Sequence, residues 1–322
     1  MPITCKKLVI GFITYGNTTA KYLPYFLPSL ANQTFKDYYT LVIDNSEKKE
    51  NRNREYLKKH YPDIDIEWPG ENIGFARANN KIISRARELG VEYVMLLNPD
   101  IVLEPIAVAK MIEAMDEGKT LGSVSAKIYQ WNFLEQKKTN IIDSCGIYLK
   151  PGLRFFDLGQ AQADKGQCDR EEILGPSGTA PMYRLSALEK IKQGSDEYFD
   201  EIMFMYKEDC DLAYRLSLAS FKSKLIDDAI IFHDRSAGGR GEKDIQVALN
   251  RCQKSRWIKE MSFFNQHIMF VKYWRAQNAK EKAAMLAYVF KILVFVLIFE
   301  QYLLGQYVKF WKIRKKILKY QI

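Results

Sequence analysis

Asp100 is a carboxylate at the abrupt end of an apolar stretch. The segment "YVMLLNPDIVLEP", residues 93–105, breaks from apolar residues into Asn98-Pro99-Asp100 and then resumes as Ile-Val-Leu. A proline fixes its own φ angle, so the backbone before Asp100 has a defined course. A plain turn is one interpretation of this break, and a metal or catalytic site is the other.

Three further carboxylates, Glu208, Asp209 and Asp211, directly precede a predicted helix at 211–221. Acids favour the positive end of a helix dipole and cap its free N–H groups, which is the simpler interpretation. The apolar run "IMFMY" before them indicates that they lie at an interior edge of the domain. A partly buried carboxylate in that place is a candidate general base.

His233 ends another apolar run, "IIFHD", and the chain has only three histidines. A single histidine is more often structural than a ligand. Its place at a strand end, followed by the glycine-rich and basic segment 234–243, favours a role in binding a metal or phosphate. We expect this segment to close over a diphosphate and to add charge through Arg235, Arg240 or Lys243.

The first hundred residues alternate between predicted strands and helices. The strands are expected at 7–14, 38–46, 64–68 and 91–100, with helices between them. This pattern predicts an α/β fold with a mostly parallel sheet flanked by helices, and ligands bind such sheets at the carboxyl ends of the strands. The polar residues expected at that edge are Thr14, Asp44, Asn45, Asn72, Gly74, Asn98 and Asp100.

The pattern beyond residue 120 is mixed. Strands are expected at 122–129, 141–149 and 223–234, and another, at 173–185, is broken by Gly-Pro-Ser-Gly. Residues 151–172 are polar and glycine-bearing and are predicted to form a loop. The chain from Gln246 onward is predicted to be helical. We therefore expect a catalytic domain at 1–245, with halves at 1–120 and 121–245, and a helical extension at 246–322.

Composition limits the partners. The chain has 322 residues, is 47% hydrophobic and carries a net charge of +9, which suits nucleic acid, anionic lipid or phosphorylated substrates. No motif that reads RNA or DNA occurs, so no nucleic-acid partner is expected. The five cysteines are widely spaced without a CxxC pair, which argues against a disulfide framework and fits the cytoplasm.

The C-terminal extension combines an apolar segment, 283–299, with a basic and aromatic tail. It fits peripheral attachment to an anionic membrane surface. It also fits a helical hairpin that packs on the catalytic domain or on the second chain of a homodimer. A full crossing of the membrane is disfavoured by Lys291 and Glu300.

Seven segments in order resemble inverting glycosyltransferases of family 2, in the rhamnosyltransferase-like branch with an Asn-Pro-Asp motif. They are "GFITYGN", "LVIDNS", "ENIGFARANN", "VMLLNPDI", "GPSGTAPMYR", "FDEIMFMYKEDCDLAYRL" and "IIFHD", spread over residues 7–235. The resemblance implies the GT-A fold and transfer of a sugar from a nucleotide-diphosphate donor. The expected donor is dTDP-L-rhamnose, with a UDP-hexose as the alternative. The expected acceptor is a lipid-linked or polysaccharide glycan at the inner face of the cell membrane.

The resemblance also implies a role for each candidate residue. Asp209 would be the catalytic base, with Glu208 beside it, and Asp100 and His233 would bind Mg²⁺ or Mn²⁺ on the donor diphosphate. Asn98 stands where relatives have a first acid, so the ion should be scarcely held without donor. Ser177 and Gly178 would line the acceptor site. The donor pocket would be formed by Thr14, Asp44, Asn45, Asn72, Gly74, Arg77, Asn98 and Asp100.

Two other classes of function remain as alternatives. One is a protein that binds a nucleotide sugar without catalysis, and the combination of Asp100, Asp209 and His233 argues against it. The other is a nucleotidyltransferase, which would normally carry a glycine-rich first loop with Arg and Lys. The segment "GFITYGN" lacks those features.

Overall fold

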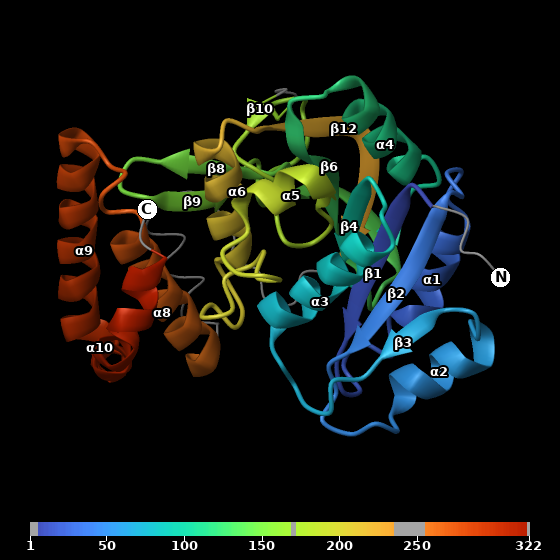
Figure 1. Cartoon of the computed structure of the whole chain (residues 1–322), viewed down its shortest axis with the longest axis horizontal. Helices are drawn as coiled ribbons and strands as arrows, with labels where there is room; N and C mark the ends of the chain where they lie inside the picture. The colour runs from blue at the N-terminus through green and yellow to red at the C-terminus, as the bar shows by residue number, and fades with distance from the viewer. Residues whose placement is uncertain (1–5, 169–171, 235–254, 321–322) are drawn as a thin grey trace.

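The computed structural model describes residues 6–168, 172–234 and 255–320 (Figure 1). The N-terminal half contains four parallel strands in the order β3-β2-β1-β4, as the alternating pattern predicts. Their bounds are β1 Leu8–Thr14, β2 Tyr38–Asp44, β3 Asp65–Glu67 and β4 Tyr93–Leu97. The helices between them are α1 Leu23–Ala31, α2 Arg52–His60 and α3 Phe75–Glu88.

The second half extends the same sheet. Strand β11 (Met182–Arg184) lies antiparallel between β4 and β6 (Leu121–Asn132), and β12 (Lys222–His233) runs parallel to β6. Strands β5 (Ile101–Leu103) and β10 (Glu172–Ile173) pair with β12, and β7 (Lys137–Ser144) pairs with β6. The helices of this half are α4 Ala107–Glu117, α5 Leu185–Ile191 and α6 Glu208–Leu218.

Three predicted boundaries in this half were wrong. The strand expected at 141–149 is interrupted at Gly146, whose φ of +102° a side chain would disfavour, so β7 and β8 (Ile147–Lys150) are separate. The loop expected at 151–172 contains β9 (Arg154–Asp157), which forms a hairpin with β8. Helix α6 begins at Glu208 instead of 211, which places the acids in its first turn.

Side chains that alternate along β1 separate the core into two layers. Leu8, Ile10 and Phe12 point to the layer that contains α1 and α4. Val9 points to the opposite layer, where α3, α5 and α6 cover the sheet. Burying each such side chain contributes roughly 1.5–3 kcal/mol, so both faces hold the carboxyl edge of the sheet in place.

The C-terminal helices are α8 Arg256–Lys272, α9 Ala279–Phe299 and α10 Leu304–Lys319, with a short 3₁₀ turn at Gln301–Leu303. Helix α8 packs on the catalytic domain, where Ile268 and Tyr273 share a core with Met203 and Tyr214. Helix α9 stands at the far edge of the molecule (Figure 1). The predicted domain boundary near residue 245 lies outside the described residues.

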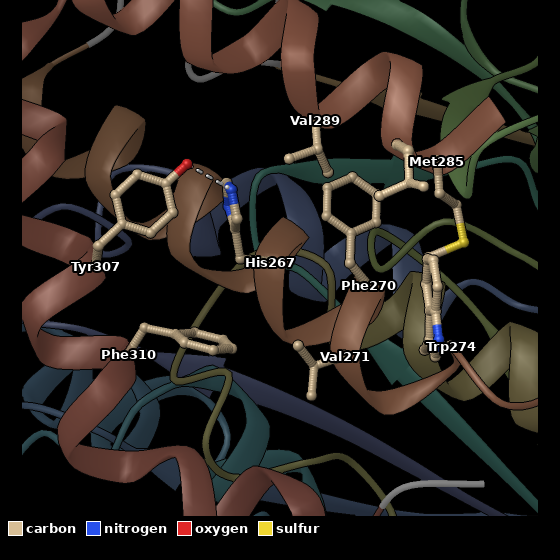
Figure 2. A pocket seen from close by; sticks show the side chains of 9 residues that line it. His267, Phe270, Val271, Trp274, Met285, Val289, Tyr307 and Phe310 are labelled. Carbon is tan, nitrogen blue, oxygen red and sulfur yellow. Dashed lines mark hydrogen bonds between the residues drawn. The ribbon is translucent and has the colours of Figure 1, made fainter. Parts of the chain in front are cut away.

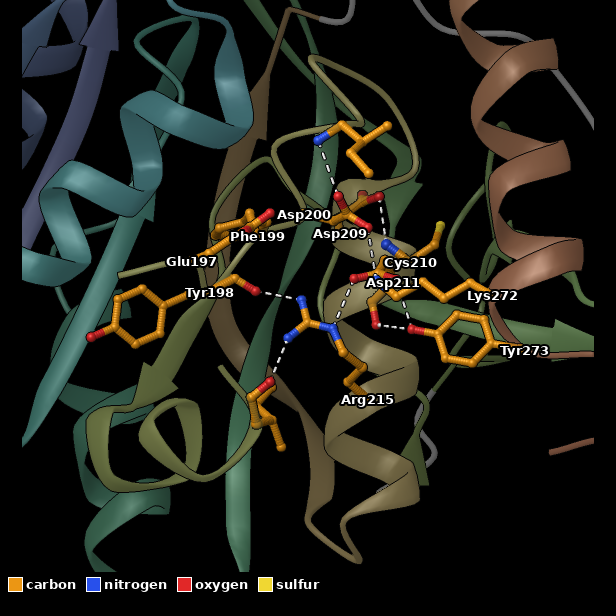
Figure 3. A network of polar contacts seen from close by, with 12 residues as sticks. Glu197, Tyr198, Phe199, Asp200, Asp209, Cys210, Asp211, Arg215, Lys272 and Tyr273 are labelled. Carbon is orange, nitrogen blue, oxygen red and sulfur yellow. Dashed lines mark hydrogen bonds and ion pairs between the residues drawn. The ribbon is translucent and has the colours of Figure 1, made fainter. Parts of the chain in front are cut away.

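A buried ion-pair network joins α8 to α6 (Figure 3). The ammonium of Lys272, at 0% exposure, lies 2.6 Å from Asp211 and 2.9 Å from Asp200. Arg215 and the Tyr273 hydroxyl also bind the Asp211 carboxylate. Burial alone would raise the pKa of Asp211, but the charges of Lys272 and Arg215 outweigh burial and lower it to about 2.

We expect Lys272→Met to lower the free energy of unfolding by about 3–5 kcal/mol, because it leaves two buried carboxylates without their lysine. Urea-induced unfolding of the full chain measures this loss. The matched control is Lys280→Met at an exposed position, which should change stability by less than about 0.5 kcal/mol. Equal stability of the two variants would contradict the role of the network.

Candidate active site

Asp44 lies at the carboxyl end of β2 with its carboxylate almost fully engaged. One oxygen accepts hydrogen bonds from Thr14 (3.1 Å) and Ser46 (2.5 Å), and the other accepts one from Asn51 (2.9 Å). Asp44 and Thr14 are both buried. Since a carboxylate has about four acceptor positions, one position remains for a donor group on a ligand.

Asn45 ties the end of β2 to the turn before α3. Its amide N–H donates to Asn72 Oδ1 (3.0 Å) and to the Gly74 carbonyl (3.2 Å), and its Oδ1 accepts from the Ile73 N–H (2.9 Å). Gly74 has a φ of +84°, and a Cβ there would lie 2.5 Å from the ring of Phe204. Only glycine fits, so this turn and the segment around Phe204 are built together.

Arg77 and Asn98 are more exposed to solvent than Thr14, Asp44 and Asn45, which are buried at the carboxyl edge of the sheet. Arg77 is mostly exposed and pairs with Glu201 at 3.3 Å. Asn98 donates its backbone N–H to the Thr179 carbonyl (2.9 Å), which joins the Asn-Pro-Asp turn to the loop that carries Ser177 and Gly178.

Asp100 and His233 face each other across β5 and β12. Nε2 of His233 lies 3.4 Å from Asp100 Oδ1, and Nδ1 lies 2.8 Å from Asp143 Oδ2. Burial alone would lower the pKa of His233, but the negative charges of Asp100 and Asp143 outweigh it and raise the pKa to about 10. Asp143, at the end of β7, was not identified from the sequence.

The Asp100–His233 pair fits part of the coordination sphere of a divalent ion. Two ligands about 2.1 Å from an ion and at right angles are about 3 Å apart. Asp100 Oδ1 is buried and forms no hydrogen bond with the residues that the structure describes. No group of three or more His, Cys, Asp or Glu side chains able to hold a metal occurs in those residues. Among the described residues, this pair offers two ligand atoms to such an ion.

Asp209 is held by two backbone N–H groups. Gly178 donates to one carboxylate oxygen (3.0 Å) and Cys210 to the other (2.7 Å). Burial, and secondarily the charge of Asp157, raise the pKa of Asp209 above its ordinary value. A fixed carboxylate with a raised pKa is suited to take a proton from a hydroxyl group.

Two polar atoms next to Asp209 are buried without a hydrogen bond in the described ranges. They are Oε2 of Glu208 and Oγ of Ser177. Burial, and then the charge of Asp209, raise the pKa of Glu208 well above its ordinary value. Unsatisfied buried polar atoms are costly, so we interpret these two as groups that a bound ligand satisfies.

Backbone contacts join these groups into one site. Thr179 accepts from the Asn-Pro-Asp turn, and the preceding residue, Gly178, donates to Asp209. The Phe204 carbonyl accepts from the Phe75 N–H at the start of α3 (2.9 Å). Residues near 178 and 204 therefore link the acids of α6 to the strand-end groups at 98–100 and 72–75.

The segment before the acids has an unusual backbone that α8 stabilises. Tyr206 and Lys207 have φ angles of +73° and +72°, in the left-handed region that side chains disfavour. The amide of Asn265 on α8 donates to the carbonyls of Met205 (2.9 Å) and Tyr206 (2.6 Å). Asn265 therefore positions the start of α6, which the sequence did not indicate.

The basic segment after His233 is described only at its first residue. The Tyr22 hydroxyl donates a hydrogen bond to Asp234 (2.6 Å). Asp234 therefore lies beside the start of α1. Arg235, Arg240 and Lys243, which we expected over a diphosphate, lie outside the described residues.

Comparisons with known proteins agree with this geometry. N-acetylglucosaminyl-diphospho-decaprenol L-rhamnosyltransferase of Mycobacterium tuberculosis is 24% identical over 243 residues, which are 71% of this chain and 76% of that protein. An uncharacterized glycosyltransferase of Methanocaldococcus jannaschii is 27% identical over 140 residues, which are 42% of this chain and 46% of that protein.

Two solved structures share the fold. GalNAc-T7 with UDP, GalNAc and Mn²⁺ gives a TM-score of 0.60 at 12% identity, over 84% of this chain. TarS of S. aureus gives 0.53 at 14% identity, over 86% of this chain. The chain covers 49% and 50% of those two chains, about half of each. Both are GT-A glycosyltransferases, so the predicted GT-A fold is confirmed.

The model of glycosyl transferase family 2 matches residues 10–192, more than half of the sequence. That match includes Thr14, Asp44, Asn72, Asp100 and the loop at 177–179. The chain belongs to glycosyl transferase family 2.

Proposed function

We propose that the protein is an inverting glycosyltransferase with Asp209 as its catalytic base. The observation that carries this proposal is the arrangement around Asp209. Two backbone N–H groups fix its carboxylate, and the unsatisfied atoms of Glu208 and Ser177 lie in the same part of the site. A rigid base beside groups that await a polar ligand suits an acceptor hydroxyl.

The reaction follows from a single base without a separate nucleophile. Asp209 takes the proton of the acceptor hydroxyl while that oxygen bonds to the anomeric carbon of the donor sugar. The bond from this carbon to the diphosphate oxygen breaks, and the nucleoside diphosphate leaves with the electron pair. One displacement from the opposite face inverts the anomeric carbon. Gly178 and Ser177 would hold the acceptor against Asp209.

The proposed donor is dTDP-L-rhamnose. The Mycobacterium tuberculosis relative, named as an L-rhamnosyltransferase, supports this choice together with the Asn-Pro-Asp motif. Asp44 has one acceptor position left for an imide N–H, which thymine and uracil both carry, so a UDP-hexose is the alternative. Thr14, Asn45, Asn72, Gly74 and Arg77 would line the rest of the donor pocket.

Asp100 and His233 would hold Mg²⁺ or Mn²⁺ together with the donor diphosphate. The ion would stabilise the charge on the leaving diphosphate as a Lewis acid. Asp143 would orient His233 by holding its other ring nitrogen. With only two protein ligands, and an amide at Asn98, binding of the ion would depend on the donor.

The proposed acceptor is a lipid-linked glycan at the inner face of the membrane. Helix α9 is long and apolar enough to cross a membrane, with a mean hydropathy of 2.2. Its exposed residues Leu286, Phe290, Val294 and Leu297 recur at helical spacing and form one apolar stripe. Exposed Lys291 within α9 favours peripheral attachment over a crossing.

Helix α10 adds basic residues next to exposed apolar ones. Val308 and Trp311 are mostly exposed, and Lys309, Lys312, Lys315, Lys316 and Lys319 are exposed as well. Such a surface would bind anionic headgroups while its aromatic and aliphatic side chains enter the interface. A homodimer through the α9 stripe is the competing arrangement.

We expect Asp209→Asn to lower kcat by about 10²–10⁴-fold because it removes the general base. A matched second variant, Asp157→Asn, should keep turnover but lower the pKa of Asp209, since a negative charge that raises it is gone. The acidic limb of the kcat/KM profile should then move to lower pH. Turnover by Asp209→Asn near that of the native enzyme would contradict the assignment.

We expect Asp143→Asn to weaken Mn²⁺ binding in the presence of dTDP by roughly 10–100-fold, because His233 loses its orienting carboxylate. Electron paramagnetic resonance of free Mn²⁺ measures the affinity independently of activity. Asp228→Asn, at an exposed position, is the control and should bind normally. An unchanged Mn²⁺ affinity in Asp143→Asn would contradict the proposal that Asp143 orients His233 for binding the ion.

We expect the full chain to float with vesicles that contain anionic phosphatidylglycerol, and less so at high salt. The double variant Phe290→Glu/Trp311→Glu should stay in solution, because both side chains are exposed on the proposed surface. Leu134→Glu, 91% exposed and on the catalytic domain, is the control. A double variant that floats like the native chain would contradict membrane binding through α9 and α10.

A further inference from the structure

A cavity of about 370 Å³ lies among α8, α9 and α10 (Figure 2). Phe270 of α8 and Trp274, just after that helix, line one side of it, Met285 and Val289 of α9 another, and Phe310 of α10 a third. An engineered cavity of about 150 Å³ holds one benzene molecule. The space among the helices therefore has room for roughly two groups of that size, which is about two five-carbon isoprene units.

The polar groups at the cavity are paired with each other. His267 Nε2 lies 3.1 Å from the Tyr307 hydroxyl, and its Nδ1 lies 2.8 Å from the Phe263 carbonyl. Burial lowers the pKa of His267 below its ordinary value, and none of the Asp, Glu, Lys or Arg side chains that the structure describes lines the cavity. The wall therefore presents no charge of its own, and an apolar ligand fits it better than a sugar or a phosphate.

Helix α8 separates the cavity from the catalytic acids. On one side, its Asn265 and Lys272 bind residues 205–206 and the carboxylate of Asp211. On the other side, its Phe270 and the following residue Trp274 face the cavity. A helix is about 10–12 Å wide with its side chains, so one helix width separates the cavity from α6.

The cavity also adjoins the proposed membrane surface. Leu286 belongs both to the cavity wall and to the exposed stripe of α9. Helix α10 contributes Phe310 to the wall and exposed lysines to the surface. Leu286 thus connects the stripe to the cavity, and the Lys282 ammonium lies 5.6 Å from the centroid of the Trp274 ring in the cavity wall, where it could bind a phosphate group.

We propose that this cavity binds the isoprenoid segment nearest the diphosphate of a lipid-linked acceptor. This inference rests on the proposed function and names the lipid that the site takes. The double bonds and methyl branches of an isoprenoid leave it fewer conformations than a saturated chain, so less entropy is lost on binding. Its flat segments pack on the aromatic walls. Binding would hold the glycan end of the acceptor toward α6, which carries Asp209.

The test is binding of farnesyl phosphate to the full chain by isothermal titration calorimetry, with dodecyl phosphate as the straight-chain comparison. We expect farnesyl phosphate to bind several-fold more tightly. Val289→Trp fills the cavity and should weaken this binding by more than about tenfold, because burial of the isoprenoid is lost. Ile298→Trp, at a position of the same helix that is 63% exposed and outside the cavity wall, is the matched control and should bind as the native chain does.

Leu286→Trp is a second variant that tests binding in the cavity. Leu286 is 59% exposed, so the cavity edge can accept the larger ring without loss of the fold. This variant should also weaken farnesyl phosphate binding, even if Val289→Trp fails to fold. Equal binding of the two lipids by the native chain, or unchanged binding in Leu286→Trp, would overturn the inference.

A separate readout distinguishes this inference from the proposed function. Hydrolysis of dTDP-rhamnose to dTDP by the native enzyme in the presence of Mn²⁺ needs no lipid. Hydrolysis without farnesyl phosphate binding would overturn the lipid site alone. Farnesyl phosphate binding without turnover of any dTDP- or UDP-sugar would overturn the proposed function and, with it, the identification of the lipid as an acceptor.

Discussion

The ion pairs of Lys272 with Asp200 and Asp211 hold the segment that carries Glu208 and Asp209 against helix α8. Asp200 and Asp211 lie on either side of the acids at 208–209, and one buried ammonium binds both. Separating these charges in the interior is costly, so residues 200–211 keep one position relative to α8. The left-handed backbone at Tyr206 and Lys207 is possible in this setting because Asn265 binds the neighbouring carbonyls.

Two consequences follow from this constraint. The first is that α8 belongs to the catalytic unit, although it comes after the family match at 10–192. The second is that a single segment is in contact with three parts of the site. Phe204 packs on Gly74 of the donor turn, Asp209 binds Gly178 of the proposed acceptor loop, and Asn265 connects both to the helices that carry the apolar surface.

The sequence predicted the parts of the structure that depend on local pattern. Strands β1 to β4 alternate with helices, so the parallel half and its carboxyl edge could be predicted, with Thr14, Asp44 and Asn72 on it. The β8–β9 hairpin was missed because β9 is a strand of only four residues within the polar and glycine-bearing segment 151–172. The Asp143–His233 contact was missed because 90 residues separate the two and no motif in β7 marks Asp143. The burial of Lys272 could not be predicted, because its carboxylate partners lie more than sixty positions earlier.

The central claim, one displacement assisted by Asp209, is tested most directly by the stereochemistry of the product. Proton nuclear magnetic resonance of the glycoside formed by the native enzyme gives its anomeric configuration, for comparison with the configuration of the sugar in the donor. The account predicts the opposite configuration in the product. A product with the same configuration as the donor would require two displacements or a front-face reaction, and would contradict the role given to Asp209.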